Sequence, residues 1–340
     1  MVKPIRIGTR ESQLAVWQAT QVKDLLALQG YTVELIYIKS EGDIDLVTPL
    51  YEMGVQGIFT KTLDSALLNN TIDIAVHSMK DVPTQLAKGI VQAAVLKRGS
   101  YKDVFVPHPD LKDVNAIFGR GLLEEQKITI TKEGSKTTER TETNHIDTGD
   151  KVKAVIATSS IRRTAQWLHR FQHHTIETLR GNVNTRLQKL KESNWQGAIF
   201  AAAGLERINL LPANSIELDW MLPAPAQGAI MVVCRDGDDH CLNACADLND
   251  ADTALCTKIE RDFLRTLLGG CSTPVSALAE IKNNEIHFNG NILSPDGKLI
   301  SQCQCVYLMN QAIDMGVKAA QQLLNNGGKE IADSIRHAGK

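Results

Sequence analysis

Short apolar runs alternate with longer amphipathic stretches through the first hundred residues. Short runs rich in aliphatic and β-branched residues are typical of buried strands, and apolar positions three or four apart are typical of helices. The pattern predicts strands at residues 5–8, 33–38 and 72–76, with helices at residues 12–28 and 59–68. This order predicts a mostly parallel, doubly wound α/β sheet.

The third strand runs into a polar turn, His77-Ser78-Met79-Lys80-Asp81-Val82-Pro83. Residues 72–76 are mostly apolar, so we expect both faces of the strand to be buried, and we expect Pro83 to end it. Ligand sites in open α/β sheets lie at the carboxyl ends of the strands. Lys80 and Asp81 are therefore candidate site residues, and a strand-end ion pair is the alternative.

A polar stretch separates this first unit from a second one. Residues 113–150 carry few large apolar groups, which predicts an exposed insertion with a β-ribbon near residues 127–131. Apolar strands follow at residues 154–157 and 197–201. They predict a second α/β unit over residues 107–224.

The last third of the chain predicts a different kind of unit. A helix at 255–268 is expected to lead into strands at 277–281, 286–293 and 299–306 and a helix at 313–324, which Asn325-Asn326-Gly327-Gly328 should end. A further strand is expected at 229–234. The expected domains are residues 1–106 with 225–246, residues 107–224, and a small α+β domain at residues 247–340.

Composition and charge disfavour several classes of protein. With 340 residues, 43% hydrophobic and 22% charged, the chain reads as a globular protein of two or three domains. A net charge of −2 carries no signature of nucleic-acid binding. No membrane span and no secretion signal are evident. Seven scattered cysteines predict free thiols in a reducing cytoplasm.

Positive charge is concentrated near the middle of the chain, where one segment holds seven basic side chains and a single acidic one. Thr158-Ser159-Ser160 should cap a helix whose first turn carries Arg162 and Arg163, so a compensating anion is expected there. Arg180 and Arg186 lie on either side of a second turn, which contains Gly181 and is likewise expected to bind an anion. The planar guanidinium group of arginine can form two hydrogen bonds with one carboxylate, which suits a ligand with several carboxylates. The alternative is a basic surface that is exposed to solvent.

Cys271 follows two glycines at the end of a predicted helix. The glycines leave its sulfur open, so Cys271 is a candidate nucleophile or attachment point, with a structural thiol as the alternative. No metal site is predicted, because no second ligand pair accompanies His240, Cys241 and Cys245. His174 is expected at the surface.

Eight segments stand out in order along the chain: GTRESQLAVWQA, SEGDIDLVTPL, IDIAVHSMKDVP, ATSSIRR, LRGNVNTRLQKL, AAAGLERINL, LPAPAQGA and LLGGCSTPVSA. Together they resemble the porphobilinogen deaminase family over nearly the whole chain. The resemblance implies two doubly wound domains like those of a type II solute-binding protein, plus the small α+β C-terminal domain.

In that family a dipyrromethane cofactor, made from two substrate molecules, hangs by a thioether from the cysteine of the GGC loop, which is Cys271 here. The resemblance implies a hydroxymethylbilane synthase that extends this primer by four porphobilinogen units and releases ammonia each time. Hydrolysis then frees the linear tetrapyrrole. Haem biosynthesis by a cytoplasmic monomer is also implied, with porphobilinogen as the partner molecule.

The resemblance assigns roles to individual residues. Asp81 is the implied central carboxylate, and Lys80 lies beside it in the cofactor site. The other implied cofactor contacts are Thr158, Ser159, Ser160, Arg162, Arg163 and Arg186. The implied contacts with the substrate or growing chain are Arg10, Ser12, Gln18, Arg180 and Arg207.

Three positions depart from the family pattern. Gln56 stands where lysine is usual, Gln13 where proline is common, and Ala226 where glycine is common. Gln56 removes one cationic contact, whereas the other two are not expected to touch the chemistry. Two alternatives stay open: a non-catalytic two-lobed module that binds a dicarboxylate, and a paralogue that turns over weakly because of Gln56.

Overall fold

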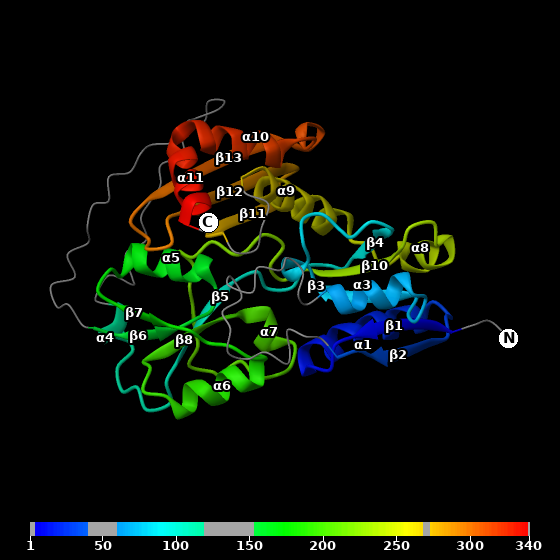
Figure 1. Ribbon diagram of the computed structural model, residues 1–340, viewed down its shortest axis with the longest axis horizontal. Helices are drawn as coiled ribbons and strands as arrows, with labels where there is room; N and C mark the ends of the chain where they lie inside the picture. Colours follow the sequence, from blue (N-terminus) through cyan, green and yellow to red (C-terminus); the bar gives the residue numbers. More distant parts are fainter. Residues whose placement is uncertain (1–3, 40–59, 119–152, 268–272, 339–340) are drawn as a thin grey trace.

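The computed structural model describes residues 4–39, 60–118, 153–267 and 273–338. These ranges contain two five-stranded sheets and one three-stranded sheet. Figure 1 shows the two larger sheets side by side, with the smaller sheet and its helices against both. No helix in the described ranges is both long and apolar enough to cross a membrane. Cys271, Gln56 and the ribbon expected at 127–131 lie outside the described residues.

The first lobe is built on the sheet β2-β1-β3-β10-β4. Strands β1, β2 and β3 are parallel, and β10 lies antiparallel between β3 and β4. The strands are β1 (Ile5–Thr9), β2 (Val33–Tyr37), β3 (Ile74–Ser78), β4 (Ile90–Val95) and β10 (Ile230–Arg235), and the helices are α1 (Gln13–Leu28), α3 (Lys61–Leu68) and α8 (Asp239–Ala246). Separate apolar clusters cover the two faces, with Val76 in one and Ala75 in the other.

The second lobe is built on the sheet β7-β6-β8-β5-β9. Strands β6, β7 and β8 are parallel, and β5 runs antiparallel to both of its neighbours. The strands are β5 (Asp103–Pro107), β6 (Val155–Ala157), β7 (Thr175–Glu177), β8 (Gly197–Ala201) and β9 (Ile216–Glu217), and the helices are α4 (Asn115–Phe118), α5 (Ile161–Arg170), α6 (Val183–Glu192) and α7 (Ala202–Glu206).

The two lobes share one topology. In each sheet three parallel strands come first and a single antiparallel strand takes the fourth place, β10 in the first lobe and β5 in the second. The chain therefore crosses between the lobes twice, once between β4 and β5 and once between β9 and β10. This is the expected pair of doubly wound α/β units, joined by two connections.

The C-terminal unit has the antiparallel sheet β11-β12-β13. Helices pack on the sheet around a core that contains Phe263 and Phe288, whose ring centroids lie 5.0 Å apart. The elements are α9 (Ala251–Leu267), β11 (Val275–Lys282), β12 (Glu285–Leu293), β13 (Ile300–Leu308), α10 (Met315–Leu323) and α11 (Lys329–Ala338). The expected small α+β unit is confirmed.

Strand β3 differs from its prediction. It begins at Ile74, includes His77 and Ser78, and is followed by a 3₁₀ turn over Met79–Asp81. The strand thus ends well before Pro83. His77 and Ser78 stay in the ladder because they pair with β10, a partner that lies far along the chain.

Other differences also come from distant partners. Strand β5 pairs in the second lobe from Asp103 onward, so the expected boundary after residue 106 falls within a strand. Ile117 and Phe118 are buried in the second lobe, so the described part of the expected insertion, residues 113–118, is exposed only in part. His174 is buried and accepts a hydrogen bond from Trp167 Nε1 at 3.1 Å.

The closing helix does not end the fold. Helix α10 gives way to a left-handed Gly327, with φ of +92°, as the glycine-rich sequence predicts. The chain then continues into α11, which the sequence reading missed.

Candidate active site

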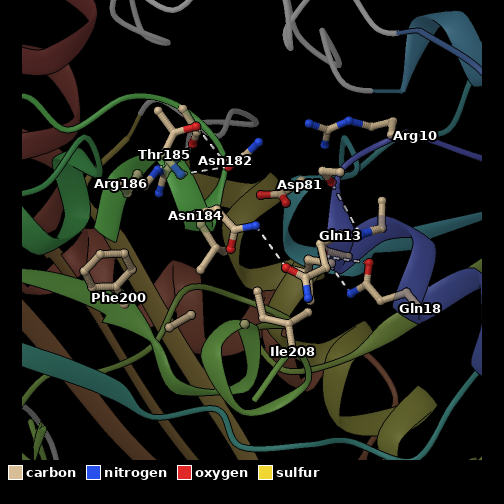
Figure 2. A pocket seen from close by; sticks show the side chains of 18 of the residues that line it. Arg10, Gln13, Gln18, Asp81, Asn182, Asn184, Thr185, Arg186, Phe200 and Ile208 are labelled. Atoms are coloured by element: carbon tan, nitrogen blue, oxygen red, sulfur yellow. Dashed lines mark hydrogen bonds between the residues drawn. The ribbon is translucent and has the colours of Figure 1, made fainter. Parts of the chain in front are cut away.

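A cavity of about 490 Å³ lies between the two lobes (Figure 2). It is lined from the first lobe by the start of α1 and the end of β3, and from the second lobe by the start of α6 and by α7. The predicted site residues that it brings together are Arg10, Ser12, Gln18, Lys80, Asp81, Arg163, Arg180 and Arg186.

The beginning of α1 forms one wall of the cavity. Ser12 is its N-cap and accepts a hydrogen bond from the Ala15 amide at 3.4 Å. Gln18, one turn further, is buried and donates to the Ser78 hydroxyl at 2.8 Å. This bond joins α1 to the end of β3. It therefore holds the beginning of α1, next to Arg10, close to the turn that follows β3.

The 3₁₀ turn that follows β3 carries Lys80 and Asp81. The Asp81 side chain is exposed and lies between Arg10 on one side and Arg186 on the other (Figure 2). Lys80 Nζ donates to Gln227 Oε1 at 3.3 Å. Burial lowers the pKa of Lys80 to about 8, against the opposing pull of Asp81.

The second lobe contributes the turn that leads into α6. Gly181 adopts φ of +112°, and a Cβ there would lie 2.7 Å from Thr185 Cγ2, so only glycine fits. Asn182 caps the helix by accepting the Thr185 amide at 3.0 Å. Arg186 Nε donates to the Gly181 carbonyl at 2.7 Å. Burial and the nearby Arg163 lower the pKa of Arg186 to about 10.

The cavity is strongly electropositive. Its described lining has six cationic side chains, Arg10, Lys39, Lys80, Arg163, Arg180 and Arg186, against the carboxylates of Glu11 and Asp81. The N-terminal ends of α1 and α6 also face it, and helix N-termini favour anions. This set of donors suits a ligand with several carboxylates, and its cations are gathered around a cavity.

The anion expected at the start of α5 is supplied by the protein itself. Asp103 on β5 is fully buried; it lies 2.7 Å from Arg162 Nη2 and accepts from Arg163 Nη2 at 2.8 Å. Burial raises the pKa of Asp103, but Arg162 and Arg163 outweigh it and bring that pKa to about 2. Arg163 still reaches the cavity lining, whereas Arg162 is not among the lining residues and donates to the Leu222 carbonyl at 2.6 Å.

The hydroxyl turn before α5 does not line the cavity either. The Ser159 hydroxyl donates to the Leu179 carbonyl at 2.6 Å, and Thr158 Oγ1 accepts the Ser160 amide at 3.3 Å. Ser160 occupies the N-cap position, although its side chain makes no capping bond. Ser159 thereby contacts the residue that precedes Arg180.

Arg207 lines a separate, smaller cavity of about 260 Å³ where the chain crosses between lobes. Its guanidinium lies 5.6 Å from the centre of the Trp17 ring and donates to the Gly228 carbonyl at 2.6 Å. The structure therefore separates Arg207 from the residues gathered around Asp81.

Sequence reasoning missed several lining residues. Asn184 Nδ2 of α6 donates to Gln13 Oε1 of α1 at 2.9 Å, which joins the lobes across the cavity (Figure 2). His77 is buried, and burial with the nearby Arg10 lowers its pKa to about 4, so it stays neutral at pH 7. Phe200 and Ile208 add apolar surface. The repeated asparagines of LRGNVNTRL were a usable signal, since asparagine is a preferred N-cap.

Comparison with known proteins matches nearly the whole chain. Residues 5–243 match the family model described as "Porphobilinogen deaminase, dipyromethane cofactor binding domain", and residues 254–325 match "Porphobilinogen deaminase, C-terminal domain". Porphobilinogen deaminase of Desulforamulus reducens is 36% identical over 99% of both chains. The chloroplastic porphobilinogen deaminase of Oryza sativa subsp. japonica is 36% identical over 98% of this chain and 87% of its own.

Among solved structures, the methionine-binding protein MetQ covers 73% of this chain and 91% of its own at 12% identity, with a TM-score of 0.40 that is too low to bear on the fold. The family models and the full-length relatives carry the same family name. An electropositive cavity between two α/β lobes is consistent with a family that binds a dipyrromethane cofactor. The chain belongs to the porphobilinogen deaminase family, whose members are enzymes of tetrapyrrole synthesis.

Proposed function

We propose that the cavity between the lobes is where this enzyme joins porphobilinogen units, with Asp81 as the central carboxylate. The observation that carries the proposal is the position of Asp81, which lies exposed among arginines from both lobes. The proposed reaction adds four porphobilinogen molecules to a dipyrromethane primer on Cys271, with loss of ammonia at each addition. Hydrolysis then releases the linear tetrapyrrole.

The residues of the cavity fit a dipyrromethane group. Each of its two pyrroles carries an acetate and a propionate, and the lining supplies a matching excess of cations. We propose that Lys80, Arg163 and Arg186 hold these acids and that Cys271 provides the covalent link. When bound, the group supplies the nucleophilic pyrrole carbon to which the first substrate unit is joined.

The residues just behind the lining have a supporting part in this proposal. Arg162 neutralises Asp103 and so keeps α5 and Arg163 in place. Thr158 and Ser159 hold the turns at the start of α5 and before Arg180. Ser160 stays a proposed direct contact at the beginning of α5.

Asp81 is suited to the chemical step. Loss of ammonia from an aminomethylpyrrole leaves a cation that is delocalised over the ring. A fixed carboxylate beside that ring stabilises the charge as it develops, and it can accept and return the protons that the step moves. Of the two described lining carboxylates, Glu11 and Asp81, Asp81 is the one on the turn after β3.

The acetate and propionate groups of the incoming substrate need cationic partners other than those that hold the primer. Arg10 and Arg180 line the cavity from opposite lobes, so one substrate can be gripped by both. We propose that Ser12 and Gln18 position this side of the site through their bonds with Ala15 and Ser78. The proposed role of Arg207 is indirect, because it lines the neighbouring cavity at the crossover.

Mass spectrometry of the intact protein tests the covalent primer. We expect a mass above that of the sequence by one dipyrrole, and we expect Cys271→Ser to lose it. An unmodified mass in fully active protein would rule out the primer. The same experiment decides against the non-catalytic dicarboxylate-binding module, which predicts reversible binding and no adduct.

Turnover of Asp81→Asn tests the central role. The amide keeps the size of the side chain and removes its negative charge, so we expect a folded protein with turnover reduced by about 10³-fold or more. Arg10→Gln and Arg180→Gln serve as comparisons that should mainly raise KM. Near-normal turnover of Asp81→Asn would remove Asp81 from the central role.

We also propose that the protein works as a cytoplasmic monomer of three domains, one for each sheet. The six described cysteines are free, which supports a reducing compartment. Light scattering coupled to gel filtration would test the monomer. The weakly active paralogue stays the second candidate, and comparing Gln56→Lys with the parent enzyme would test it, since a large gain in kcat/KM would favour it.

A further inference from the structure

A side chain of the C-terminal unit contacts the turn that carries Lys80 and Asp81. Arg261, on α9, is 9% exposed and extends toward the first lobe. Its Nη1 donates to the carbonyl oxygens of Val82 at 2.9 Å and Met79 at 3.4 Å, and its Nη2 donates to that of Pro83 at 2.6 Å. The guanidinium therefore binds the chain on both sides of Lys80 and Asp81.

The turn has few backbone bonds of its own. Met79 donates its amide to the Ala229 carbonyl at 3.0 Å, and Val82 donates back to Met79 at 3.2 Å. The side chains of Met79 and Val82 are buried in the first lobe. These contacts anchor the two ends of the turn, and Arg261 adds hydrogen bonds to the carbonyl oxygens of Met79, Val82 and Pro83.

Helix α9 is a firm base for this contact. The neighbouring Glu260 is fully buried and pairs with Arg98 Nη1 at 2.6 Å. Glu260 also accepts the amides of Ala226 at 2.6 Å and Ala279 at 2.8 Å. One residue of α9 thus fixes the helix to the lobe crossover, and the next residue reaches the catalytic turn.

We propose that Arg261 is a positioning residue for the reaction, because it sets the orientation of the turn that presents Lys80 and Asp81 to the cavity. The proposal rests on the role of Asp81 proposed above. Arg261 lines neither described cavity, and its proposed effect is on the turn. Through Arg261, the C-terminal unit, whose sequence includes Cys271, supports the turn of the first lobe that presents Asp81.

The test combines steady-state kinetics with hydrogen–deuterium exchange on the holoenzyme. In Arg261→Gln we expect kcat to fall by about tenfold to a hundredfold, as for a small misplacement of a catalytic group, with KM within about threefold. We also expect faster exchange in the peptide that covers residues 79–84. Arg265→Gln is the matched control, since Arg265 is exposed on the same helix and pairs with Asp262; it should change neither quantity.

Two further variants keep the result decisive. Arg261→Lys preserves the charge and one donor group, so it should lose less kcat than Arg261→Gln, and it replaces that variant if the latter does not fold. Asp81→Asn is measured in the same series. Unchanged exchange in the turn, or kcat within about twofold of the parent while Asp81→Asn is inactive, would overturn the proposal. An active Asp81→Asn would instead remove Asp81 from the reaction, and the exchange rate would still decide whether Arg261 holds the turn.

Discussion

At the scale of single residues, Lys80 and Asp81 are neighbours with different surroundings. Asp81 is exposed to the cavity, whereas Lys80 is half-buried and bonded to Gln227. Gln227 in turn donates to Asp103 at 2.9 Å. Lys80 therefore belongs to a polar network that reaches the start of α5, and both Lys80 and Asp81 line the cavity.

The lowered pKa of Lys80 predicts a pH effect on binding. With its pKa at about 8, Lys80 is charged at pH 7 and loses its charge as pH rises through 8. We expect KM for porphobilinogen to rise between pH 7 and 9, because Lys80 then holds less firmly the acids of the primer to which the substrate must be joined. Lys80→Arg should remove that step, since arginine stays protonated. A pH profile of KM with the same step in Lys80→Arg would assign it to another group.

The same shift predicts the sign of a stability change. The folded-state pKa of Lys80 lies below the ordinary value of 10.5, so the unfolded chain binds more protons between about pH 8 and 10.5. The Lys80 contribution to the free energy of unfolding should therefore rise with pH across that window. Urea unfolding of the parent and of Lys80→Met, which lacks the titrating group, would isolate this contribution.

One departure from the family pattern acts on the backbone. Ala226 stands in the left-handed region with φ of +62° and is fully buried. Its amide donates to Glu260 at 2.6 Å, so the strained conformation is held by the base of α9. The substitution affects local strain and not the cavity, as expected. Gln13, in contrast, lines the cavity.

At the scale of elements, the start of α5 is organised by an acid from another strand. Two arginines in the first turn of a helix oppose its dipole, and Asp103 on β5 compensates them from within the protein. The sequence pattern predicted that an anion would compensate Arg162 and Arg163. It did not show that β5 would lie next to α5, because that neighbour is decided by the order of strands in the sheet.

Asp103→Asn tests this arrangement. Removing one partner of a buried ion pair leaves uncompensated charge, so we expect a loss of about 3–5 kcal/mol in the free energy of unfolding. The control is Asp219→Asn, which removes an exposed partner of Lys102 and should cost at most about 1 kcal/mol. Urea unfolding followed by tryptophan fluorescence measures both, and equal losses would contradict the buried-pair account.

The pH dependence of this pair has a definite direction. The folded-state pKa of Asp103 is about 2, below the ordinary 3.8. The stabilisation from its charge is therefore complete above pH 4 and is lost as pH falls toward 2. The parent should show this acid-dependent loss, and Asp103→Asn should lack that part of it.

At the scale of the whole molecule, the cavity exists because two lobes of the same topology meet. The chain crosses between them twice, and the C-terminal unit contacts both, through Arg98 with Glu260 and through Gln166 with Ser276 at 3.1 Å. One exposed hydrogen bond, from Asn184 to Gln13, closes the far side of the cavity.

Gln13→Pro tests that contact. Gln13 is the first residue of α1, a position that accepts proline, so the change removes the side-chain amide with little cost to the helix. A single neutral hydrogen bond contributes about 1 kcal/mol. We therefore expect a more open substrate-free protein by small-angle scattering and a KM about two- to fivefold higher.

Asn184→Ala should reproduce both effects of Gln13→Pro. Gln188→Ala is the control, because Gln188 lies on the same helix and bonds with Glu192 instead. If Gln13→Pro and Gln188→Ala gave the same scattering and the same KM, the bridge would have no part in closing the cavity.

The limits of sequence reading are clearest at β3 and its turn. The apolar run and the polar residues after it placed Lys80 and Asp81 at the end of a buried strand, and the structure confirms that position. The exact strand end was wrong, because pairing with β10 extends the ladder to Ser78. Local pattern finds a strand, whereas a distant partner decides where it stops.

The arginines show the same division. Their number and their turns indicated an acidic ligand, and six cations do line the cavity. Which arginines reach it could not be read from spacing, since Arg162 and Arg163 are adjacent and only Arg163 lines it. Arg207 likewise faces a second cavity. Side-chain direction and neighbouring acids decide this, and both depend on the folded chain.

The sequence by itself determined the family, the two α/β units, the C-terminal unit and the turn that carries Lys80 and Asp81. Periodicity and short motifs are local, so they survive in the sequence without knowledge of the fold. Only the tertiary structure decided that Asp103 neutralises Arg162 and Arg163, that Gln13 meets Asn184, and that Arg261 holds the carbonyls around Asp81. Those contacts join residues far apart in the chain, and packing alone brings them together.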